Sequence, residues 1–84
     1  MIAASRRRWT LADSATAHLV RIVLADDWSP DIAGRRLHEL VGDDRRLLRD
    51  VRARVRRAAT ERPSEVAQRA LATLNAALGE AEPA

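Results

Sequence analysis

The chain has 84 residues, of which 15 are basic and 12 acidic, and it contains no cysteine. So short a chain forms one domain with a small core, and the lack of thiols excludes disulfides, thiolate zinc sites and cysteine nucleophiles. No apolar window reaches the length of a membrane span, and the basic start lacks the apolar stretch of a signal peptide, so we expect a cytoplasmic protein.

The charge balance is basic, with a net charge of +3 and a pI of about 11.2. A basic protein favours acidic partners such as nucleic acid or an acidic protein. All 15 basic residues are arginine and alanine is frequent, which indicates a GC-rich codon usage and weakens that inference. The small core favours a partner that completes it, such as a second copy in a homodimer.

The first predicted helix covers residues 11–27. Thr10 and Asp13 have the spacing of a capping box, although Asp13 is a competing choice for the cap. The apolar residues of this helix share one broad face, which is typical of a helix packed on two sides. Its members are Ala12, Ala15, Leu19, Ile22 and Val23, with Val20 and Leu24 widening it.

The second predicted helix covers residues 30–41. Ser29 is the expected N-cap, Pro30 occupies the first helical position, and Gly42 provides a left-handed stop. We expect Trp28 to cover the helix start rather than to stack on a nucleic-acid base. The predicted packed face holds Ala33, Leu37, Leu40 and Val41.

Two further helices are predicted, over residues 44–60 and 64–78. Asp43 is the expected cap of the third helix, and Pro63 separates it from the fourth, which starts near Ser64 and stops at Gly79. Their apolar faces are Leu47, Leu48, Val51, Val55 and Ala58, then Val66, Ala67, Ala70, Leu71, Leu74 and Leu78.

The whole pattern predicts a single all-α domain of four helices, either helix-turn-helix-like or a compact helical bundle. No segment alternates apolar and polar residues as a strand does. Residues 1–9 are expected to be a flexible basic arm, and residues 79–84 a tail that is frayed after Gly79.

The third helix carries seven arginines between Asp44 and Arg57. At about 100° per residue, four of them fall on one side of the helix, beside its apolar face. Asp50 lies four residues from Arg46 and from Arg54 and is expected to pair with both. The remaining ridge is predicted to be uncompensated and consists of Arg45, Arg49, Arg52 and Arg56.

Such a ridge can follow a phosphate backbone, which gives salt-dependent affinity with little sequence preference. A solvated face that keeps the protein in solution is the alternative interpretation. In the N-terminal arm, Arg6, Arg7 and Arg8 can enter a minor groove, or form a plain disordered terminus. The candidate contact residues for nucleic acid or a partner are Arg45, Arg49, Arg52, Arg56, Arg46, Arg6, Arg7 and Arg8.

The segment "WSPDIAGRRL", residues 28–37, resembles the "WSP-x-x-IAGRL" segment in the helix-turn-helix of a group of insertion-sequence transposases. It has one residue, Asp31, where the family has two, and Arg36 is extra. The rest of the chain lacks an acidic catalytic core, so the resemblance implies a DNA-binding fold and not a transposase. It makes the third helix the recognition helix, with Arg45, Arg46 and Arg49 reaching bases or phosphates. The length of that helix suits an antiparallel hairpin equally well.

Catalytic and metal-binding patterns are missing from the sequence. His18 and His38 are its only histidines, and no acidic group accompanies them at metal-ligand spacing. No nucleophile elbow or glycine-rich phosphate loop occurs. We therefore expect no enzyme activity and no cofactor. The sequence favours a small DNA-binding regulator or accessory factor, and the alternative is a protein-interaction module, an adaptor or an antitoxin-like regulator, that binds an acidic partner. Binding to an anionic membrane is a weaker third option.

Overall fold

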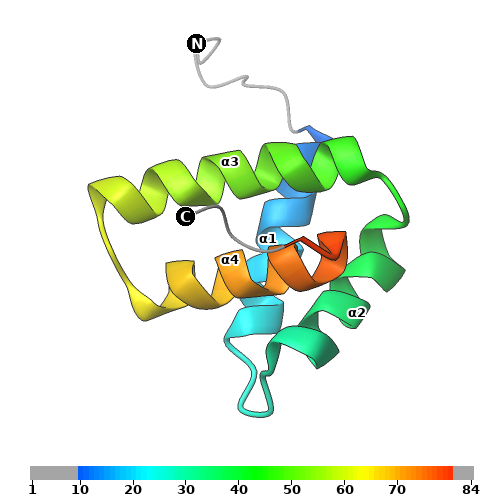
Figure 1. The fold of residues 1–84 in the computed structure, drawn as a ribbon, viewed down its shortest axis with the longest axis horizontal. Coiled ribbons are helices and arrows are strands. Elements are labelled where there is room, and N and C mark those ends of the chain that lie inside the picture. The colour runs from blue at the N-terminus through cyan, green and yellow to red at the C-terminus, as the bar shows by residue number, and fades with distance from the viewer. Residues whose placement is uncertain (1–9, 81–84) are drawn as a thin grey trace, which may run out of the picture.

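The computed structural model describes residues 10–80, and these residues form four helices and no strand. The all-α fold class is therefore confirmed. The predicted arm at residues 1–9 lies outside the described residues, as do residues 81–84 of the predicted tail. The helices are α1 (Leu11–Val23), α2 (Pro30–Val41), α3 (Arg45–Glu61) and α4 (Glu65–Leu78) (Figure 1).

A polar residue caps the N-terminus of each helix, in most cases at or near the position that the sequence indicates. Thr10 and Asp13 form a full capping box, in which the Asp13 N–H donates to Thr10 Oγ1 at 3.2 Å and the Thr10 N–H to Asp13 Oδ2 at 2.9 Å. Ser29 and Ser64 cap α2 and α4.

The expected cap of α3 is wrong by one residue. Asp44 is the cap, because its carboxylate accepts the Leu47 N–H at 3.0 Å. Asp43 instead lies in the turn, with its Oδ1 atom 3.4 Å from His38 Nε2. Gly42 ends α2 as predicted, but not in the expected left-handed conformation. Its φ is 75° and its ψ is −158°, a backbone region that only glycine readily occupies.

Helix α1 ends at Val23, four residues before its predicted end. Residues 24–27 form a turn in which the Ala25 N–H donates to Ile22 O and the Trp28 N–H to Ala25 O. Asp26 and Asp27 are poor residues for a helix C-terminus, because that end of the helix dipole is negative.

The packing centres on α4, which contacts each of the other three helices. Helices α3 and α4 run antiparallel, α2 packs on α4, and α1 crosses the other side of the bundle (Figure 1). Among the four described helices, α2 and α3 are the one pair that does not pack together. Of the two arrangements that the sequence left open, this favours the compact bundle, since a helix-turn-helix packs its two helices against each other.

The core is small and made of aliphatic side chains. Five predicted packing residues are exposed instead. They are Ala58 and the larger Val20, Leu24, Leu40 and Val66, which are 38–61% exposed. Leu24 is exposed because α1 has already ended, and Leu40 because α2 packs against only two helices. The buried apolar residues are Ala15, Leu19, Ile22, Val23, Ala33, Leu37, Leu48, Val51, Ala70, Leu74 and Leu78.

Small residues let α2 and α4 approach closely. A Cβ atom on Gly34 would lie 3.0 Å from Ala76 Cβ and 3.0 Å from the Ala77 backbone nitrogen. Contact this tight leaves no room for a side chain. Within residues 10–80, no helix is both long and apolar enough to cross a membrane.

Trp28 joins the turn after α1 to α4. Its indole N–H donates to Thr73 Oγ1 at 2.9 Å, and the fully buried Thr73 hydroxyl donates in turn to Arg69 O at 2.8 Å. The Arg69 guanidinium lies 4.9 Å from the centre of the Trp28 ring and donates to Val23 O at 3.2 Å. These contacts of Trp28 are with α4, whereas the sequence placed its ring over the start of α2.

Replacing Thr73 by valine keeps the shape of the side chain and removes the acceptor of the Trp28 N–H. We expect Thr73→Val to lower the free energy of unfolding by about 1–3 kcal/mol, as the loss of a buried hydrogen-bond partner does. Urea denaturation measures this. The matched control is Thr60→Val, because the exposed Thr60 hydroxyl also bonds the carbonyl four residues earlier, at 3.0 Å. Equal losses in the two variants would contradict the role of Thr73.

Candidate nucleic-acid interface

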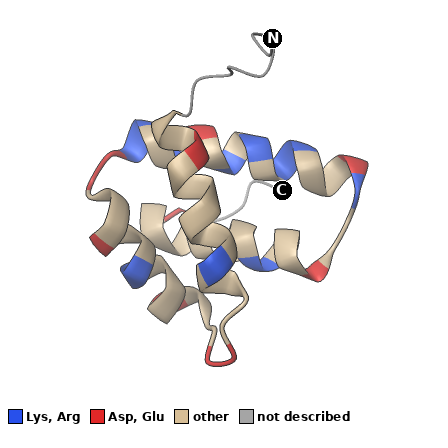
Figure 2. Cartoon of the chain, turned by 180° about the vertical axis from the view of Figure 1, so that it is seen from behind, with Lys and Arg blue, Asp and Glu red and all other residues tan. Residues whose placement is uncertain are grey.

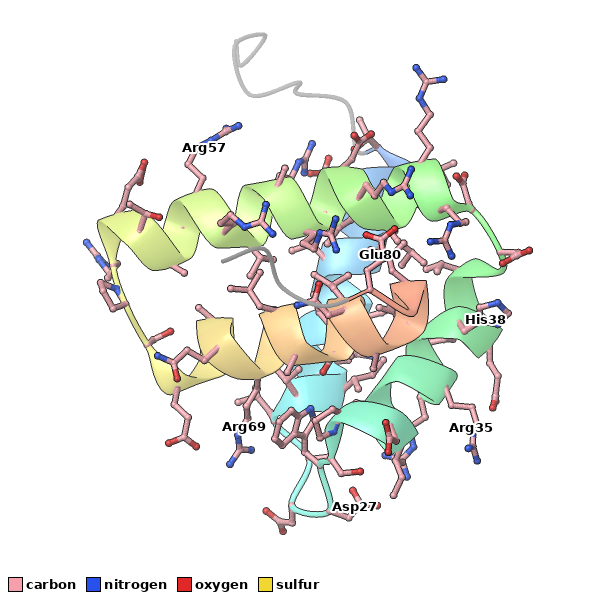
Figure 3. The ribbon with its side chains drawn as sticks, viewed as in Figure 1. Asp27, Arg35, His38, Arg57, Arg69 and Glu80 are labelled. Carbon is pink, nitrogen blue, oxygen red and sulfur yellow. The ribbon has the colours of Figure 1, made fainter. Side chains whose placement is uncertain are left out.

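Three arginines of α3 converge on one carboxylate, and we call Arg45, Arg49 and Arg52 the tri-arginine cluster. Glu80 Oε2 accepts from Arg45 Nη2 at 3.0 Å and from Arg49 Nη2 at 2.8 Å. Glu80 Oε1 lies 3.0 Å from Arg52 Nη2. Figure 3 shows Glu80 at the end of α4, reaching toward α3. Both oxygens of the carboxylate are therefore engaged by guanidinium groups.

The C-terminal turn of α4 fixes the position of Glu80. Gly79 adopts a left-handed conformation, with a φ of 67° and a ψ of 30°. Its N–H donates to Ala76 O at 3.2 Å, and the Glu80 N–H donates to Asn75 O at 3.0 Å. This is the hydrogen-bond pattern of a Schellman motif. The predicted frayed tail is thus wrong at Glu80, because the turn that ends α4 holds the Glu80 backbone beside α3.

The three arginines differ in how open they are to solvent. Arg52 is the innermost, with 13% of its side chain exposed, and its Nη1 donates to Asn75 Oδ1 at 2.9 Å. Arg45 and Arg49 are 46% and 54% exposed. The Arg52 guanidinium is therefore held in place inside the cluster, whereas solvent can reach Arg45 and Arg49.

The cluster lowers the pKa of Glu80 from 4.5 to about 2. The hydrogen bond from Arg49 is the largest cause, partial desolvation opposes it, and the hydrogen bond from Arg52 and the charges of both arginines add to it. The carboxylate stays ionised near neutral pH. Since three guanidinium groups face one carboxylate, the cluster keeps an excess of positive charge.

The prediction of an uncompensated ridge is wrong for these three residues. The sequence placed them on one edge of α3, but that edge faces the end of α4, and Glu80 is 31 residues from Arg49. Arg56, the fourth member, is half-buried. The expected pairing of Asp50 with Arg46 and with Arg54 is also wrong. Asp50 forms no ion pair within residues 10–80, and Arg54 Nη1 donates to Asp13 Oδ1 at 3.0 Å.

The outward face of α3 carries other arginines. Arg46 and Arg57 are exposed, and neither forms an ion pair within residues 10–80. Arg57 points away from the bundle in Figure 3. Figure 2 shows basic residues along α3, whereas the turn after α1, at the opposite end of the molecule, is acidic. Arg6, Arg7 and Arg8 lie outside the described residues.

Three hollows lie elsewhere on the described surface. One of about 360 Å³ lies along the seam between α2 and α4 and is lined by Asp31, Gly34, Arg35, His38, Ala76 and Ala77. A second, of about 410 Å³, is lined by Trp28, Glu65, Gln68 and Arg69. A third, of about 290 Å³, is apolar and lies between α1, the end of α3 and the start of α4. No group of three or more His, Cys, Asp or Glu side chains that could hold a metal ion occurs within residues 10–80.

Comparison with protein-family models, curated proteins and solved structures gives no match to this chain. The resemblance of residues 28–37 to the transposase segment therefore stays an expectation from sequence.

Glu80 makes stability depend on pH in acid. Its pKa is lower in the folded chain than its usual value of 4.5, so the ion pairs stabilise the fold fully above about pH 5 and are lost as the pH falls toward about 2. We expect Glu80→Gln to be less stable than the parent protein near neutral pH, and the difference to vanish in acid. Urea denaturation across this pH range measures it.

The control for this series is Glu39→Gln, which removes an exposed acid of α2 that forms no ion pair within residues 10–80. It should change stability little at any pH. If the free energies of unfolding of the parent protein and Glu80→Gln differ by the same amount down to about pH 2, the lowered pKa of Glu80 is contradicted.

Proposed function

We propose that this protein binds duplex DNA through the exposed arginines of α3 and acts as a small regulator or accessory factor. The observation that carries the proposal is the outward face of α3, where Arg46 and Arg57 are exposed and form no ion pair within residues 10–80. From Arg46 to Arg57 this face spans about 16 Å, at 1.5 Å per residue. That length covers several phosphates of one DNA strand.

The contacts that we propose are with phosphates rather than bases. Helices α2 and α3 do not pack on each other, so the packing gives no support to base readout by a helix-turn-helix. Guanidinium groups bind phosphate oxygens through paired N–H donors, and such contacts carry little sequence information. The proposal also places the protein in the cytoplasm, in contact with DNA. It includes a homodimer, whose two-fold symmetry would match that of a duplex. Light scattering measures whether the protein is a dimer.

An acidic protein is the second candidate partner. It is favoured by one specific observation, namely that the tri-arginine cluster already binds a carboxylate of its own chain. The two candidates differ in salt dependence, because DNA binding releases condensed counterions from the duplex and so weakens steeply with salt.

DNA binding is measured by the fluorescence anisotropy of a short labelled duplex of mixed sequence. We expect binding at about 50 mM salt that weakens strongly by about 200 mM. Arg46→Ala and Arg57→Ala should each weaken it, and each should reduce the slope of log affinity against log salt by roughly 0.9.

The matched control is Arg35→Ala, which removes the same charge from the exposed surface of α2 (Figure 3). It should leave the slope unchanged. Absence of binding at about 50 mM salt, or equal effects of all three substitutions, would contradict the proposal. Capture of one acidic protein at fixed stoichiometry, without DNA binding, would favour the second candidate.

A further inference from the structure

We propose that the tri-arginine cluster is a phosphate-binding site and that Glu80 is its internal, displaceable occupant. The inference rests on the proposed function, because the displacing group is a phosphodiester of the DNA that α3 binds. The tri-arginine cluster is then a second zone of contact with DNA, beside the outward face of α3. Because Glu80 occupies this cluster, the chain lowers its own affinity for DNA.

The donors of the cluster suit an oxyanion. Three guanidinium groups reach the two carboxylate oxygens at 2.8–3.0 Å. Arginine binds carboxylate and phosphate with the same planar set of donors. Arg52 is held by Asn75 as well as by Glu80, so this donor group stays in place when Glu80 leaves.

The charges favour an exchange of one anion for another. A phosphodiester carries one negative charge, as the Glu80 carboxylate does, and the cluster supplies three positive charges. Replacing Glu80 by a phosphodiester therefore leaves the local charge unchanged. Arg45 and Arg49 are about half exposed while they bind Glu80, so a phosphate of a duplex lying on α3 can approach both.

Glu80 can leave without disturbing the core. It follows Gly79, beyond the last residue of α4, and its side chain is 29% exposed. The nearest core residue of α4 is Leu78, which lies within the helix. Rotation of the Glu80 side chain therefore releases the carboxylate, and the Schellman turn and the helix packing stay as they are.

The test compares the affinity of the parent protein and of Glu80→Gln for the same labelled duplex. Glutamine keeps the size and an acceptor oxygen but lacks the charge, and circular dichroism checks that the variant folds. We expect Glu80→Gln to bind about tenfold more tightly, as one added charge-assisted hydrogen bond to phosphate gives. The slope of log affinity against log salt should increase by roughly 0.9 for each additional phosphate that the arginines neutralise.

The control Glu39→Gln makes the same change in net charge on α2, away from the cluster. It should raise affinity much less than Glu80→Gln does. In a second control, Arg45→Ala combined with Glu80→Gln should abolish most of the increase in affinity, because the phosphate binds to the guanidinium groups that Glu80 releases.

The possible outcomes separate the two proposals. Tighter binding by Glu80→Gln than by Glu39→Gln supports the inference, including when the parent protein itself binds too weakly to measure. Equal binding by the parent protein and both variants overturns the inference and leaves the proposed function intact. Absence of binding by all of them overturns both, and binding to anionic vesicles in place of the duplex does the same.

Discussion

Helices α1 and α4 each contact the other three helices, and the most extensive packing in the bundle is that of α4 against α2 and α3. Since α2 and α3 do not contact each other, α4 joins them. Its buried face holds Ala70, Thr73, Leu74 and Leu78, and its small residues let α2 approach at Gly34. Polar contacts hold its middle and its last turn. Arg69 and Thr73 in the middle of α4 bind Val23 and Trp28, and Glu80 binds α3 just after the helix ends. A core this small benefits from such links, because few large side chains are available to bury.

Local signals in the sequence predict the helices well. Ser29 caps α2 as predicted, the capping box at Thr10 is present, and α4 begins next to Ser64 and stops at Gly79. These features depend on neighbours within four residues, so the sequence carries them directly. The end of α1 was missed because its apolar pattern continues past Val23, into a turn whose course depends on the distant contact of Trp28 with Thr73.

Long-range contacts account for what the sequence could not predict. Periodicity placed Leu40 and Val20 on packed faces, but the described bundle has no helix to cover them. The same method put Arg45, Arg49 and Arg52 correctly on one edge of α3 and could not show that this edge faces Glu80. A charge pattern along one helix identifies its own faces, whereas the partner of each face depends on the tertiary fold.

The arginines of α3 thus have two different environments. Those of the tri-arginine cluster bind an anion of their own chain, and Arg46 and Arg57 face solvent. Which of these arginines contact DNA is measured most directly by the NMR spectrum of the arginine Nε–Hε groups during titration with a duplex. The account predicts shifts of the Arg46 and Arg57 signals from contact with phosphates, and of the Arg45 and Arg49 signals as a phosphate replaces Glu80, with those of Arg35 and Arg69 unmoved. Shifts spread evenly over all arginines, or none at low salt, would contradict it.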